Sequence, residues 1–170
     1  MKISALIDKQ KDFLTNELEG GFKQLAQQCN GVMDSTVRLD ELLFAHMQKC
    51  RYANLVYVLD HNGVQLSANI NKNEILSDFQ GQDLSARPFF NIINHQHSFY
   101  LSDAYISGVT LKPCISAVQA ICQNDKLIGM LVFDLELEKL PLLDQKIGLS
   151  DFRQIKGDPE IRSNLFNQNR

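Results

Sequence analysis

Two strongly apolar runs near the end of the chain constrain the fold more than any other feature. They read PCISAVQAICQ, residues 113–123, and KLIGMLVFDLEL, residues 126–137. The turn-forming stretch Gln123-Asn124-Asp125-Lys126 joins them. Two such runs on either side of so short a turn predict a pair of antiparallel strands.

Three further runs complete a predicted sheet of five antiparallel strands. One is SFYLSDAYIS, residues 98–107, and the other two are Leu55–Leu59 and Val64–Ala68. Asp60-His61-Asn62-Gly63 separates the last two, and Asn-Gly between such runs is a strong hairpin signal. Residues 71–96 are polar and broken, with a short helix expected after Pro88, so they form a long excursion from the sheet.

The N-terminal part of the chain is predicted to be helical. A second helix is expected within LDELLFAHMQKC, residues 39–50, after a break at Asn30-Gly31. The first helix has its weak point at Gly20-Gly21. It carries one apolar stripe with three-and-four spacing, made by Ile3, Leu6, Ile7, Phe13, Leu14, Leu18, Phe22, Leu25, Ala26 and Cys29.

This order of elements predicts an α+β fold with a long N-terminal helix and helices on the faces of the sheet. Residues 1–50 form a helical region that packs on the sheet or pairs with a second copy of the chain. Residues 51–140 form the sheet core, and residues 141–170 form a tail of short helices.

Composition excludes several classes of protein. With 44% hydrophobic and 22% charged residues and a net charge of −3, the chain is globular and lacks the basic surface of a nucleic-acid-binding protein. It contains neither an apolar run of about 18 residues nor a signal peptide, which predicts a cytoplasmic protein without a membrane segment. The spacing of its cysteines indicates reduced thiols, not a zinc site or a redox pair: Cys29, Cys50, Cys114 and Cys122.

Four segments share a pattern with a known family of sensors. They are Asp60-His61-Asn62-Gly63, GQDLSARPFF at residues 81–90, YLSDAYIS at residues 100–107, and LIGMLVFDLEL at residues 127–137. In this order they resemble the D-x-x-G, G-x-D-x-S-x-R-P-[YFW]-[FY], Y-x-S-x-x-Y-x-S and G-x-[LV]-x-x-D segments of the single Cache domain. That PAS-like module binds small ligands in bacterial receptors.

The resemblance implies a ligand-binding sensory domain that carries out no chemistry. Cache domains generally lie outside the cell between two transmembrane helices, and this sequence contains neither helix. Because the chain starts at Met1 and continues after the last strand with RQIKGDPEIRSNLF, residues 153–166, a stand-alone cytoplasmic member is expected in preference to an excised piece of a receptor.

Arg87 is the first candidate ligand-binding residue, because a guanidinium can hold a carboxylate with two hydrogen bonds. The alternative is that Arg87 pairs with Asp83 or Asp78 and only ties down the loop. The resemblance places the arginine over the pocket and makes Phe89 and Phe90 its walls, although a core position is the stronger expectation for Phe90.

Asp103, Tyr105 and Ser107 are spaced to share one face of a strand, since strand side chains alternate. They can equally face solvent while Ala104 and Ile106 pack inward. The resemblance favours the ligand-facing arrangement and adds Asp134 as a second acid that contacts the amino end of a ligand.

Arg87, Asp103 and Asp134 together would suit a zwitterion. The amino-acid-binding subfamily, however, has a tryptophan-tyrosine pair after the arginine and a tyrosine before it, whereas this chain has Phe89-Phe90 and Gln82. An amino acid, an amine and a small carboxylate therefore all remain open as ligands.

No cofactor, metal site or catalytic residue is expected. His95 and His97 have no further ligand at suitable spacing, and no nucleophile, oriented base or phosphate-binding loop is recognisable. The rival prediction is a structural or adaptor module that keeps the sensor fold and has lost the pocket, for example because Phe89 and Met130 fill it. In either case a homodimer through the N-terminal helix is expected, and a downstream signalling partner stays unknown.

Overall fold

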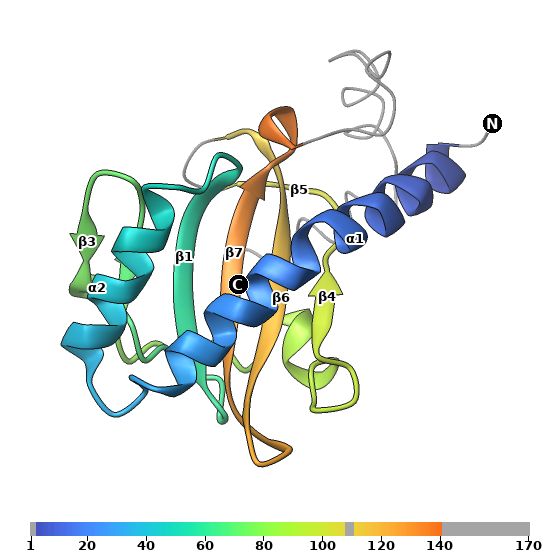
Figure 1. Ribbon diagram of the computed structural model, residues 1–170. Helices are drawn as coiled ribbons and strands as arrows, with labels where there is room; N and C mark the ends of the chain where they lie inside the picture. Colours follow the sequence, from blue (N-terminus) through green and yellow to red (C-terminus); the bar gives the residue numbers. More distant parts are fainter. Residues whose placement is uncertain (1–2, 108–110, 141–170) are drawn as a thin grey trace.

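The computed structural model describes residues 3–107 and 111–140. These residues form an α+β fold in which two helices lie on one side of an antiparallel sheet (Figure 1). The helices are α1 (Ile3–Asn30) and α2 (Thr36–Met47). The strands are β1 (Ala53–Asp60), β2 (Asn69–Ile70), β3 (Ile75–Leu76), β4 (Phe99–Leu101), β5 (Tyr105–Ile106), β6 (Pro113–Gln123) and β7 (Lys126–Glu136).

Within the described residues the sheet has the strand order β3-β2-β1-β7-β6-β4, with β5 paired to β6. All pairings between these strands are antiparallel. The predicted α+β class is therefore confirmed. The two long strands β6 and β7 form the centre, and left-handed backbone at Asn124 (φ 52°) and Asp125 (φ 61°) makes the tight turn between them.

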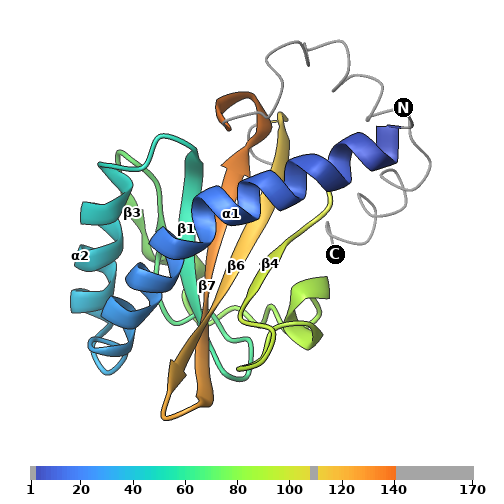
Figure 2. The same ribbon diagram turned by 45° about the vertical axis from the view of Figure 1, so that its right-hand side comes forward.

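Helix α1 crosses the sheet diagonally, as Figure 2 shows from a second angle. The middle and end of its apolar stripe are buried against the strands, with Leu14 and Leu25 each 2% exposed. The ring of Phe22 stacks on Phe133 of β7 with centroids 4.4 Å apart and planes 7° from parallel. Helix α2 begins after Ser35, whose side chain accepts a hydrogen bond from Arg38 N.

Three details of the predicted sheet were wrong. The segment Val64–Ala68 is not a strand; it makes only isolated bridges, and the side chain of Ser67 accepts the hydrogen bond of Val58 N that a strand would take. The run 98–107 is interrupted, because β4 ends at Leu101 and β5 starts at Tyr105. The sheet has seven strands instead of five, because the interrupted run gives two strands and the short pair β2 and β3, at the start of the excursion and just before it, replaces Val64–Ala68.

The excursion covers the sheet on the side away from α1. It contains the 3-10 helices Ser77–Phe79 and Pro88–Asn91, the second of which begins at the proline as expected. A third 3-10 helix, Leu137–Lys139, follows β7. The predicted helical tail, residues 141–170, lies outside the described residues.

A bulge in β7 fixes which side chains share a face of the sheet. Cys122 pairs with Leu127 but Ile121 pairs with Gly129, so Ile128 is the extra residue. Gly129 beside it fits only without a side chain, because a Cβ there would lie 2.6 Å from the carbonyl oxygen of Leu59. Beyond the bulge, Ser116 is paired with Asp134.

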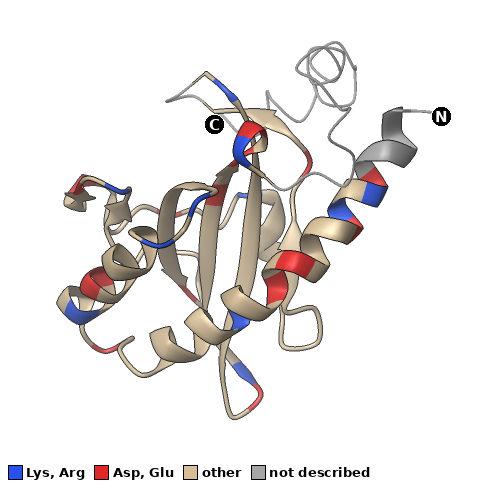
Figure 3. Ribbon diagram, turned by 45° about the horizontal axis from the view of Figure 1, so that its top comes forward, with Lys and Arg blue, Asp and Glu red and all other residues tan. Residues whose placement is uncertain are grey.

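The two faces of the sheet have different cores. The face under α1 is apolar apart from the buried Gln119 and includes Phe133, Leu131 and Leu135, each 0% exposed. The opposite face has a smaller core under the excursion, formed by Tyr57, Leu59, Phe89, Ile93, Val118, Ala120, Met130 and Val132. Figure 3 shows that charged residues lie mainly on helices and loops, and that the central strands carry few.

None of the described helices has the length and apolar character needed to cross a membrane.

Candidate functional site

A cluster of polar side chains lies at one end of the face opposite α1. The hydroxyl of Tyr105 on β5 donates to Asp134 Oδ1 on β7 over 2.9 Å. Ser116 Oγ on β6 donates to the same oxygen over 3.1 Å, and the two hydroxyl oxygens are 3.0 Å apart. We call these three residues the Asp134 cluster.

The sheet register explains how three strands meet at this point. Asp134 lies directly across from Ser116, and paired residues of antiparallel strands point to the same side. Tyr105 pairs with Cys114, two residues before Ser116, so its side chain reaches along the same face. The cluster continues the row that begins with Met130 and Val132 in the small core.

The surroundings of Asp134 act on its charged form in two opposite ways. Burial raises the pKa of Asp134, while the hydrogen bonds from Tyr105 and Ser116 and the charge of Arg87 lower it. The net direction is upward. Burial and the neighbouring Asp134 carboxylate also raise the pKa of the Tyr105 hydroxyl, so this tyrosine stays a donor.

Arg87 and Asp134 act on each other across the space between the excursion and the sheet. Arg87 comes directly before the 3-10 helix Pro88–Asn91, and its N–H donates to Leu84 O over 3.0 Å. Tyr57 on β1 is influenced by both charges: burial and Asp134 raise its pKa, and Arg87 lowers it. A cation from the covering segment and an anion from a central strand therefore lie within electrostatic reach of each other and of Tyr57.

The alternative partner for Arg87, Asp83, has local hydrogen bonds. Its Oδ1 accepts from Ser85 N over 2.9 Å, and hydrogen bonds from the Ser85 side chain and backbone lower the pKa of Asp83. Asp83 thus stabilises the turn that leads into Arg87.

Of the two phenylalanines, Phe89 is the more deeply buried, whereas Phe90 was the one expected in the core. Phe89 is 5% exposed and belongs to the small core with Val132 and Met130, whereas Phe90 is only partly buried. Phe90 packs at the edge of that core, beside the turn at Gly63. Phe89 is therefore the core residue, and Phe90 is the more accessible aromatic side chain.

Asp103 and Ser107 lie outside the Asp134 cluster. Asp103 falls in the gap between β4 and β5, so strand alternation does not place it with Tyr105, and its carboxylate pairs with Lys11 of α1 over 2.5 Å. Ser107 follows β5, and its backbone N–H donates to Lys112 O over 3.0 Å. Of the predicted set, the structure brings Tyr105 into contact with Asp134 and places Arg87 within electrostatic reach of Asp134.

Two residues of this region were not predicted from the sequence. Ser116 is the one hydroxyl residue in the run PCISAVQAICQ, and it lies opposite Asp134, the first of two acids in the partner run. Tyr57 is buried in the small core, 7% exposed. The signal for Ser116 was its polarity within an apolar strand, but using it required the register.

A second acid lies two residues further along β7. The side chain of Glu136 is 4% exposed, and its carboxylate oxygens lie 3.4 Å from Lys112 Nζ and 2.8 Å from Lys139 Nζ. Burial works to raise the pKa of Glu136, but Lys139, Lys112 and Asn54 together bring it below the ordinary value. Glu136 is neutralised within the protein, whereas Asp134 is supported mainly by neutral hydroxyls.

No protein-family model matches the chain, and no curated protein sequence does. Solved structures do match. The extracellular domain of the putative histidine kinase vpHK1S-Z8 is 16% identical with a TM-score of 0.60, over 80% of this chain and 55% of that one. The YkuI protein of Bacillus subtilis, which has an EAL domain and was solved with c-di-GMP and calcium, is 19% identical with a TM-score of 0.56, over 78% and 35%.

The ligand-binding domain of the Campylobacter jejuni chemoreceptor Tlp3, in complex with L-valine, is 16% identical with a TM-score of 0.50, over 80% of this chain and 60% of that one. The chain thus spans between about a third and three fifths of these three structures. At such low identity the matches concern the fold. Together with the antiparallel sheet and its two helices, they show that this chain has the PAS-like α+β fold of these domains.

Proposed function

We propose that the chain is a non-enzymatic sensory domain that holds a small ligand between the Arg87 segment and the central strands. The observation that carries the proposal is the electrostatic coupling of Arg87, from the covering segment, with Asp134, from β7. Sites for small molecules combine apolar walls with a few convergent polar groups. Here Phe89 and Phe90 would supply the walls, and Arg87, Tyr105 and Asp134 the polar groups.

The charges favour a ligand that carries an amino group. The carboxylate of Asp134 would hold an ammonium group, and the guanidinium of Arg87 would hold a carboxylate of the same ligand if one is present. The L-valine complex of the chemoreceptor domain with this fold is consistent with an amino acid. Asp103, which the sequence also assigned to the ammonium group, pairs with Lys11, so we place only Asp134 there.

A thermal-shift screen against amino acids, amines and dicarboxylates tests the proposal. A ligand present at 100 times its dissociation constant stabilises the folded state by about 2.7 kcal/mol, which raises the melting temperature measurably. We expect Arg87→Ala to remove the shift given by a carboxylate-bearing ligand. Arg38→Ala, on the exposed side of α2, is the matched control and should retain the shift.

One observation favours a second candidate, a structural or adaptor module without a ligand. Phe89 and Met130 are 5% and 1% exposed within one apolar core, and these are side chains that would fill a lost pocket. The screen separates the two candidates: if no compound raises the melting temperature and Arg87→Ala changes nothing in any binding assay, the adaptor function holds and the sensor proposal fails.

A ligand-sensing role also requires that the ligand bind two states of the protein with different affinity. The predicted homodimer is one way to read such a change. Because the stripe from Leu14 to Cys29 is buried against the sheet, a dimer would have to use another surface. Light scattering during size-exclusion chromatography, with and without ligand, tests this; the cytoplasmic location likewise stays a prediction.

A further inference from the structure

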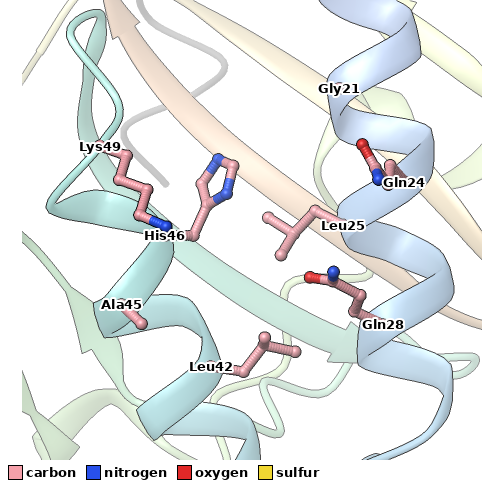
Figure 4. A pocket seen from close by; sticks show the side chains of 8 residues that line it. All are labelled: Gly21, Gln24, Leu25, Gln28, Leu42, Ala45, His46 and Lys49. Carbon is pink, nitrogen blue, oxygen red and sulfur yellow. The ribbon is translucent and has the colours of Figure 1, made fainter.

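An open groove lies between α1 and α2, away from the Asp134 cluster. Its volume is about 340 Å³, near the lower limit of small-molecule sites. In Figure 4 the ring of His46 and the side chains of Leu25 and Gln28 point into the space between the helices. The residues that line it are Gly21, Gln24, Leu25, Gln28, Leu42, Ala45, His46 and Lys49.

The polar lining favours an anion. Lys49 lies at the rim near His46, and burial followed by the charge of Lys49 lowers the pKa of His46. The charge of Lys49 thus disfavours the charged form of His46, and an anion between the two side chains would relieve this. Gln24 and Gln28 add amide donors from α1, and none of the described residues that line the groove is acidic.

The floor of the groove favours an apolar body. Leu25 is 2% exposed and Leu42 is partly buried, while Ala45 leaves room beside them. A ligand that fills the groove would cover these side chains and keep its anionic group at the rim.

Gly21 keeps one wall of the groove open. A Cβ at Gly21 would meet nothing within 4 Å, so neither crowding nor a positive φ requires glycine in this helix. Glycine in a helix interior is destabilising. The weak point of the first helix therefore lies at the groove.

From this lining we infer that the groove between α1 and α2 is a second binding site, one that takes a small carboxylic acid with an apolar body. Lys49, His46 and the two glutamines bind the carboxylate, and Leu25 and Leu42 contact the apolar part. This inference does not depend on the site at Asp134.

Titration of the full chain with phenylacetate, followed by NMR of the histidine rings, tests the inference. The chain has four histidines, so the spectrum is simple, and His46→Gln assigns the relevant signal. We expect a saturable shift of His46 and no shift of the exposed His95. Phenylacetamide, which has the same shape and no charge, should leave His46 unchanged.

Three variants locate the binding. Lys49→Met should weaken phenylacetate binding by about two- to fivefold, the range for an exposed charge interaction. Gly21→Met should abolish the shift of His46 by filling the groove. Gly20→Met is the matched control, because Gly20 does not line the groove and is equally unhindered; both glycine variants should be more stable than the parent chain.

Four results would overturn the inference. They are the absence of a saturable shift at His46, an equal response to phenylacetamide, and an equal response of the two glycine variants. The fourth is a shift of His46 that follows protein concentration without any phenylacetate, which would assign the groove to a second copy of the chain.

Discussion

The two faces of the sheet differ in what their side chains can contribute. The face under α1 is apolar except at Gln119, with Phe133 and Leu135 fully buried. The opposite face is apolar only under the excursion and becomes polar at Ser116 and Asp134. Since successive residues of one strand point to opposite faces, β7 serves both at once: Phe133 packs on Phe22 and His46, and Asp134 accepts two hydroxyl hydrogen bonds.

Within the single strand β7, residues that face α1 therefore contribute mainly to stability, and residues on the other face are available for binding. Apolar burial under α1 supplies most of the free energy of folding, which leaves the other face free to hold polar groups that cost stability. Substitutions on the two faces should therefore give different kinds of effect.

The largest expected effect is on the α1 face. Phe133→Ala should lower the free energy of unfolding by about 3–5 kcal/mol, because it removes a fully buried ring and leaves a cavity. Urea unfolding measures it. A loss below about 1 kcal/mol would mean that this face is not the main source of stability.

On the opposite face, Tyr105→Phe should cost about 1.5 kcal/mol, the low end for a hydrogen bond to a charged group, because the site is only partly buried. Tyr100→Phe, on the same face, is the control and should cost less than half as much. Equal losses would show that the hydroxyl of Tyr105 does not stabilise Asp134.

Asp134 and Glu136 should affect the pH dependence of stability in opposite directions. The pKa of Asp134 is raised in the folded state, so between about 3.9, the unfolded value, and that higher pKa the folded chain binds more protons and stability falls as pH rises. Asp134→Asn should remove this fall and stabilise the ligand-free protein at neutral pH.

The pKa of Glu136 is lowered in the folded state, so its stabilisation is complete above about 4.3, the unfolded value, and is lost as pH falls through the folded pKa. Glu136→Gln should lower stability at neutral pH and reduce the loss in acid. Urea midpoints measured between pH 3 and 8 for both variants check the signs. If the two substitutions changed the pH dependence of stability in the same direction, the opposite pKa shifts of Asp134 and Glu136 would be contradicted.

The smallest effect is expected at the pair of Lys11 and Asp103. Both side chains are partly exposed, at 26% and 54%, so Asp103→Asn should change stability by about 0.2–1 kcal/mol. Any ligand that raises the melting temperature should do so equally in this variant. If the Asp103→Asn variant lost the ligand-induced rise in melting temperature, Asp103 would have to be part of the binding site.

The sequence was sufficient to predict helices and strands where local signals and tertiary packing favour the same structure. The stripe of the first helix predicts α1 to within a residue, and the turn at Asn124-Asp125 predicts the β6–β7 hairpin. It was insufficient at Val64–Ala68, where the alternation of apolar and polar residues suggests a strand. There, side-chain oxygens accept backbone hydrogen bonds that strand pairing would otherwise satisfy. Ser67 Oγ accepts from Val58 N, and Asp40 Oδ1 accepts from Ala68 N.

Only part of the candidate site could be predicted from the sequence, because local patterns identify single residues but not the long-range contacts between them. Arg87, Tyr105 and Asp134 were found through segment patterns, and their convergence depends on how the excursion folds back. Asp103 was assigned by alternation along a strand that is in fact interrupted, because Ser102 Oγ accepts a hydrogen bond from Ser116 N there. No local pattern encodes such a long-range interruption.

The bulge at Ile128 has a consequence for how this protein can change. If the same residues of β7 paired in a regular ladder without a bulge, Ser116 would lie across from Phe133, and Asp134 would turn toward α1. Deletion of the Ile128 codon would remove the bulge and keep this pairing, whereas one residue added or lost between the bulge and Asp134 would exchange the two faces of β7 beyond it, placing a carboxylate under the helix and a phenyl ring among the hydroxyls. The length of this strand, and not only its composition, is inherited information on which both the core and the polar cluster depend.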